Sequence, residues 1–146
     1  MRPSLAMFFR NSKGEYAALD RHADFHLVGH GQRKAWPRAR QMILDATEVF
    51  VSAASIWEIA IKVKIGKLEG DPHEFAAAIP GSGFRELFIS ARHAATVHEL
   101  PFYHRDPFDR LLIAQTLSEP MRFLTADSLL EKYSELVMTV PKEKIS

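Results

Sequence analysis

Apolar residues follow two alternating patterns from residue 37 onward, short continuous runs and helical spacing. Short apolar runs between polar residues predict buried strands, whereas apolar residues three or four positions apart predict helices with one buried face. The predicted strands are residues 48–53, 85–90, 121–126 and 135–140, and the predicted helices are residues 37–46, 55–68, 71–83, 91–100, 106–119 and 127–133. This alternation predicts an α/β layered fold around a mostly parallel sheet.

Local signals indicate where several helices begin and end. Ser55 and Glu58 fit the Ser-x-x-Glu capping pattern, and Gly66 is expected to end that helix. Asp71 is expected to cap the helix opened by a proline, and Thr125 to cap the helix after the strand at 121–126.

The composition changes near Pro37. Residues 1–36 are rich in His, Gly and Arg and have weak periodicity, whereas residues 37–146 are regularly patterned. A length of 146 residues fits one compact domain. We therefore expect one structural domain in which residues 1–36 form an atypical N-terminal segment.

Composition and charge exclude several classes of function. The chain has no cysteine, which excludes disulfides, thiolate catalysis and cysteine zinc sites. No apolar run approaches the ~18 residues that span a bilayer, so we expect a soluble cytoplasmic protein without a membrane partner. A net charge of +1 gives no overall basic field, but a local patch or a metal ion can still accommodate RNA phosphate.

Two carboxylates stand three residues apart in HRDPFDRLLIAQ, residues 104–115. Asp106 suits the N-cap position, Pro107 the first helical position, and Asp109 the positive end of the helix dipole. Helix-start chemistry and catalysis therefore both remain open for these aspartates. His104 either contacts a phosphate or points toward solvent.

Two other acids follow predicted strands, Glu58 after residues 48–53 and Asp127 after residues 121–126. In an open α/β sheet, strand ends and the starts of the following helices share one edge, where ligands bind. If these helices flank the switch point of strand order, Glu58, Asp109 and Asp127 converge. Converging carboxylates imply a cation, and oxygen ligands suit Mg²⁺ or Mn²⁺, which can activate water against a phosphodiester.

Other side chains near these acids are expected to be structural. Trp57 and Phe108 suit the core or an interface better than base stacking. Lys62, Lys64 and Lys67 suit a solvated helix face, although a basic edge could guide RNA.

Three segments in order, SAASIWEIAIKVKIGKL, LPFYHRDPFDRLLIAQ and FLTADSLLEKY, resemble blocks of PIN-domain ribonucleases, in particular VapC-type toxins of bacterial toxin–antitoxin pairs. The resemblance implies a three-layer α/β/α fold with a central mostly parallel sheet. It also implies Mg²⁺-dependent endoribonuclease activity on RNA, homodimerisation and inhibition by a cognate antitoxin. Matched by position, Glu58, Asp109 and Asp127 correspond to the family's acids, and Asp106 keeps the capping role.

The family has a further acid at the end of its first strand, and Asp20 is the nearest match here. The surrounding residues suit neither a buried strand nor an apolar helix. We hypothesise that the residues before Pro37 are read out of frame. Codon degeneracy allows residues 20–36 to be translated from a start one nucleotide later, which gives an Ile-Asp-Thr segment with its Asp at the position of Arg21. Sequencing independent clones tests this hypothesis, and an intact frame in all of them would reject it.

Two other functions remain open from the sequence. Without a matching first acid, the chain could be a non-catalytic PIN-like module that binds antitoxin or RNA without cleavage. A receiver-like phosphoacceptor also uses acids and a threonine at strand ends, but the lysine on a terminal strand that such sites need is missing.

Overall fold

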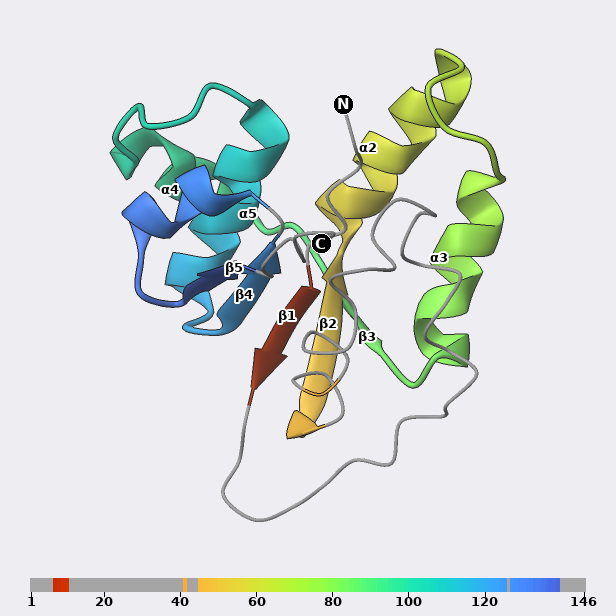
Figure 1. The fold of residues 1–146 in the computed structure, drawn as a ribbon, viewed down its shortest axis with the longest axis horizontal. Helices are drawn as coiled ribbons and strands as arrows, with labels where there is room; N and C mark the ends of the chain where they lie inside the picture. Colours follow the sequence, from red (N-terminus) through yellow and green to blue (C-terminus); the bar gives the residue numbers. More distant parts are fainter. Residues whose placement is uncertain (1–6, 11–40, 42–44, 126, 140–146) are drawn as a thin grey trace, which may run out of the picture.

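The fold is a five-stranded sheet with helices on both faces (Figure 1). The computed structural model describes residues 7–10, 41, 45–125 and 127–139. The strands, in sheet order β3-β2-β1-β4-β5, are β3 (Arg85–Leu87), β2 (Glu48–Ser52), β1 (Met7–Arg10), β4 (Arg122–Thr125) and β5 (Val137–Thr139). The helices are α2 (Ala53–Lys64), α3 (Pro72–Gly81), α4 (Ala91–Thr96) and α5 (Pro107–Ser118), with 3₁₀ helices η1 (Val97–Glu99) and η2 (Ser128–Tyr133).

Four of the strands run in one direction and the central one opposes them. The β2–β3 and β4–β5 pairs are parallel, whereas β1 is antiparallel to both β2 and β4. The expectation of a mostly parallel sheet is therefore confirmed, with β1, which the sequence patterns had not indicated, as the one antiparallel strand of the described sheet. A short apolar run fits a buried strand in either direction, so its pattern carries no information on direction.

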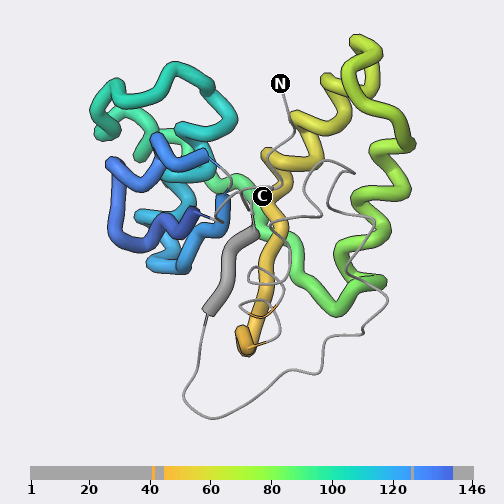
Figure 2. The backbone as a smooth tube through the Cα atoms, viewed as in Figure 1, coloured from red at the N-terminus to blue at the C-terminus, as the bar shows by residue number. Residues whose placement is uncertain are grey.

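The two faces of the sheet bury different apolar clusters. Val49 and Val51 of β2 pack on one side with Ile79 of α3. Phe50, between them in sequence, packs on the other side, where Leu112 of α5 is completely buried. Alternation along β2 thus separates the layers, with α3 on one side and α4 and α5 on the other (Figures 1 and 2). The three-layer α/β/α fold expected from the sequence is confirmed.

The start of α2 differs from the prediction. Ser52, the last residue of β2, caps α2 because its Oγ accepts a hydrogen bond from the Ala54 N–H at 3.1 Å. Ser55 lies inside the helix, so the predicted Ser55–Glu58 capping box is wrong. The extended backbone of Ser52 suits an N-cap, which lets the strand pass directly into the helix. The helix ends at Lys64, and Gly66 follows with φ +77°.

The last helical segment also begins differently. Asp127, rather than Thr125, caps η2, because its carboxylate accepts from the Leu129 N–H at 3.0 Å. The Thr125 hydroxyl instead accepts from the Asp127 N–H at 3.1 Å. The predicted cap of α3 is confirmed, since Asp71 accepts from the His73 N–H at 2.9 Å.

Two further expectations concern residues that the structure describes in part or not at all. Most of the helix expected at residues 37–46 lies outside the described residues, as do Asp20 and the segment with the proposed shifted frame.

Among the described helices, none has both the length and the apolar character needed to cross a membrane.

Candidate metal centre

The start of α5 separates the roles of its two aspartates. Asp106 caps the helix by accepting hydrogen bonds from the Phe108 N–H at 2.8 Å and the Asp109 N–H at 3.1 Å. Pro107 occupies the first helical position, as expected. Because the cap holds the first turn, the position of Asp109 at the sheet edge is defined by the backbone, and its carboxylate remains available for other contacts.

Asp127 approaches the same place from the end of β4. One carboxylate oxygen, Oδ1, caps η2, and the other, Oδ2, lies 3.2 Å from His104 Nε2. The capping bond therefore orients the side chain, and one oxygen faces Asp109 and His104.

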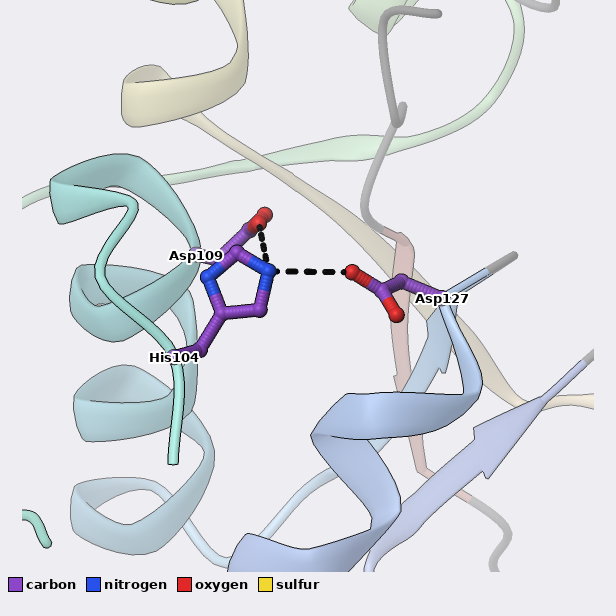
Figure 3. A group of neighbouring side chains, drawn as sticks. All are labelled: His104, Asp109 and Asp127. Atoms are coloured by element: carbon purple, nitrogen blue, oxygen red, sulfur yellow. Dashed lines mark ion pairs between the residues drawn. The ribbon is translucent and has the colours of Figure 1, made fainter. Parts of the chain in front are cut away.

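His104 joins the two aspartates (Figure 3). Its Nε2 atom lies 3.2 Å from Asp127 Oδ2 and 3.7 Å from Asp109 Oδ2. One potential ligand atom from each of the three residues lies within 4.8 Å of the others. The imidazole thus points at the carboxylates rather than toward solvent. Its place two residues before the Asp106 cap was the only sequence signal for this arrangement.

Glu58 lies on the first half of α2 and is 8% exposed. Its Oε1 atom pairs with Lys62 Nζ at 2.6 Å, one helical turn further on. Within the part of the chain that the structure describes, no group donates a hydrogen bond to the buried Oε2 atom. Lys62 is 6% exposed, so the prediction that it lies on a solvated face is wrong. The four-residue spacing brings its ammonium group onto Glu58 as a buried partner.

The charges of Glu58 and Asp127 both act on Asp109. Burial, the largest cause, and the neighbouring carboxylates of Asp106, Glu58 and Asp127 together raise the pKa of Asp109 to about 6, although His104 opposes this shift. Like charges that are crowded and partly dehydrated gain stability from a cation. The Glu58 oxygen that has no partner among the described residues and the carboxylate oxygens of the two aspartates fit Mg²⁺ or Mn²⁺.

An aromatic contact links the helices that carry two of these acids. The rings of Trp57 and Phe108 meet edge to face, with centroids 4.9 Å apart and an interplanar angle of 70°. Each ring directly precedes an acid, Glu58 on α2 and Asp109 on α5. Trp57 remains 58% exposed, so it is not a core residue. The contact stabilises the approach of the two helix starts at the site.

The fourth predicted site residue, Asp20, lies outside the described residues. The structure therefore brings Glu58, Asp109 and Asp127 to one edge of the sheet and adds His104 and Lys62. The assignment of the three acids as metal ligands and catalytic residues stays a prediction.

Comparison with known proteins identifies the family. The family model described as the PIN domain matches residues 17–136, which is most of the chain and begins before Pro37. Searches against curated proteins and against solved structures gave no significant match. With a match over most of its length, the chain belongs to the PIN domain family, whose members are generally metal-dependent nucleases.

Proposed function

We propose that this chain is a Mg²⁺-dependent endoribonuclease toxin of the VapC type, which cleaves RNA phosphodiester bonds and is inhibited by a cognate antitoxin. The observation that supports it most is the meeting of Asp109 and Asp127, whose ligand atoms lie within 4.8 Å of each other. Glu58 acts on Asp109 through its charge and has a buried oxygen without a hydrogen-bond partner among the described residues. Membership of a family of metal-dependent nucleases supports the same reaction class.

In this proposal, Glu58, Asp109 and Asp127 hold Mg²⁺, or Mn²⁺, directly or through water. The bound ion supplies an activated water molecule and neutralises charge that develops on the phosphodiester. Lys62 orients Glu58 through the 2.6 Å ion pair and leaves one oxygen for the site. Asp109 must lose its proton to bind a cation, and a pKa of about 6 allows this near neutral pH.

The test is incubation of the purified full chain with structured RNA and Mg²⁺, with Asp109→Asn as the site variant. We expect internal cleavage by the unmodified chain, a loss of at least about 100-fold in the variant, and no cleavage in EDTA. Asp45→Asn removes an exposed carboxylate outside the site and is the matched control. Equal cleavage by the unmodified chain and Asp109→Asn would reject the proposed site.

A second candidate function is a non-catalytic PIN-like module that binds antitoxin or RNA. The direction of β1 favours it. Met7 pairs with Val51 and Leu124 near the site edge, whereas Arg10 pairs with Glu48 at the other end of β2. The carboxyl end of β1 therefore lies away from the three acids, so among the described residues this strand presents no fourth acid there. RNA binding without cleavage by the unmodified chain would support this alternative.

The proposal includes two protein partners, a second copy of the chain and the antitoxin. An interface is supported by three exposed apolar residues at helical spacing on α2 and its C-cap, Trp57, Ile61 and Ile65, which are 58%, 38% and 58% exposed. Sedimentation equilibrium of the purified chain tests homodimerisation, and co-expression with the product of a short adjacent reading frame tests inhibition.

A further inference from the structure

The backbone of His104 is held by Tyr133, which is 29 residues away in sequence, and by Arg110 in the first turn of α5. The His104 N–H donates to Tyr133 Oη at 2.8 Å, and the His104 carbonyl accepts from Arg110 Nη1 at 3.4 Å. Arg110 is 6% exposed and also donates to the carbonyls of Val97, Leu100 and Pro101. One buried guanidinium therefore fixes the segment between η1 and α5 that carries the histidine.

The imidazole ring of His104 is also held by a hydrogen bond. Nδ1 accepts a hydrogen bond from the Asp106 N–H at 3.1 Å. Because a backbone N–H can only donate, Nδ1 carries the lone pair and the ring hydrogen is on Nε2. The Nε2 atom that carries this hydrogen lies 3.2 Å from Asp127 Oδ2 and 3.7 Å from Asp109 Oδ2. In this tautomer Nε2 is a donor and has no lone pair for a metal ion.

We propose that His104 is a positioning residue of the site, which donates from Nε2 to Asp127 and holds that carboxylate beside Asp109 in the spacing that a divalent cation needs. The inference rests on the proposed function for the identity of the cation. Side chains that hydrogen-bond to ligating groups orient them, and their loss typically lowers metal affinity or activity by about 10–100-fold. Asp106 thus has two tasks, since its side chain caps α5 while its backbone N–H selects the tautomer of His104.

The first test needs no metal. In the full-length, metal-free chain at pH 8, ¹⁵N NMR of the histidine rings should give the Nε2–H tautomer for His104. The Nε2–H proton signal should shift in Asp127→Asn. A Nδ1–H tautomer, or a signal that does not respond to Asp127→Asn, would overturn the proposal.

The second test measures metal affinity without RNA. Titration calorimetry with Mg²⁺ and with Mn²⁺ should give Kd values about 10-fold weaker for His104→Ala, by a similar factor for both ions. His104→Gln should recover most of the affinity, since its amide N–H can donate from nearly the same position. His98→Ala, an exposed histidine of η1, is the control that should leave affinity unchanged.

Three results of the calorimetry would overturn the proposal. Unchanged affinity in His104→Ala removes the positioning role. Tighter binding means that the imidazole competes with the cation. A much larger loss for Mn²⁺ than for Mg²⁺ indicates direct nitrogen ligation, because nitrogen ligands favour the transition metal.

The same variants separate this inference from the proposed function. Metal affinity that depends on His104 in a chain that never cleaves RNA contradicts the proposed function alone. RNA cleavage by a chain whose metal affinity is the same with and without His104 contradicts this inference alone.

Discussion

Asp109 lies where burial and three nearby carboxylates disfavour its charge. Its pKa rises from 3.8 to about 6, so the folded chain keeps a proton that the unfolded chain releases between these values. The folded state therefore binds more protons in this interval, and the free energy of unfolding falls as pH rises through it. Above pH 6, the charged side chain destabilises the metal-free protein by a constant amount.

Asp109→Asn should therefore stabilise the metal-free protein at pH 8, because the amide remains uncharged. One pKa unit corresponds to about 1.4 kcal/mol, and partial exposure reduces the full effect, so we expect a gain of about 1–3 kcal/mol. The gain should disappear near pH 4. Urea unfolding in EDTA between pH 4 and 8 measures it, and a gain independent of pH would contradict this explanation.

At the scale of secondary structure, Ser52 joins β2, α2 and α5. Its Oγ accepts from the Ala54 N–H and donates to Gln115 Oε1 at 2.6 Å, and Ser52 itself is completely buried. Ser55, one turn later, is also buried, but its Oγ has no hydrogen-bond partner among the described residues. The two serines thus share residue type and burial but differ in hydrogen bonding, since Ser52 is the N-cap of α2 and Ser55 lies inside the helix.

We therefore expect substitution by alanine to have different effects on stability at Ser52 and at Ser55. Ser52→Ala loses a helix cap and leaves the buried Gln115 oxygen without its donor, which should cost about 2–3 kcal/mol of stability. Ser55→Ala removes a hydroxyl that has no hydrogen-bond partner among the described residues and should be neutral or slightly stabilising. Urea unfolding of both variants measures the difference. A larger loss of stability in Ser55→Ala than in Ser52→Ala would contradict this expectation and support the Ser55–Glu58 capping box that the sequence predicted.

At the scale of the whole molecule, the site is assembled from three separate segments. Glu58 comes from the helix after β2, Asp127 from the end of β4, and Asp109 from the helix between them in sequence. A cation that binds all three must favour the folded chain, because the unfolded chain does not hold the acids together.

Mg²⁺ should therefore increase the free energy of unfolding at pH 8, by about 2.7 kcal/mol when its concentration is 100 times Kd. The increase should be absent in Asp127→Asn, which keeps a hydrogen-bonding side chain but loses the charge. Thermal unfolding with Mg²⁺, and with NaCl at equal ionic strength, measures it. Equal stabilisation by NaCl, or by Mg²⁺ in Asp127→Asn, would show that the effect is not binding at this site.

The sequence by itself determined the features that depend on neighbours along the chain. The spacing of apolar residues predicted β2, β3, β4 and β5, and Asp106 with Pro107 predicted the start of α5. The order of acids after strands and at helix starts led to Glu58, Asp109 and Asp127 as candidates. These signals are local, because strand alternation and capping involve residues only a few positions apart.

Only the tertiary structure decided which groups meet across those elements. It set the direction of β1, the burial of Lys62, and the place of His104 between Asp109 and Asp127. The position of His104 depends on Tyr133, which is 29 residues away in sequence. Contacts over such separations depend on how the layers pack, and no pattern of nearby residues encodes them.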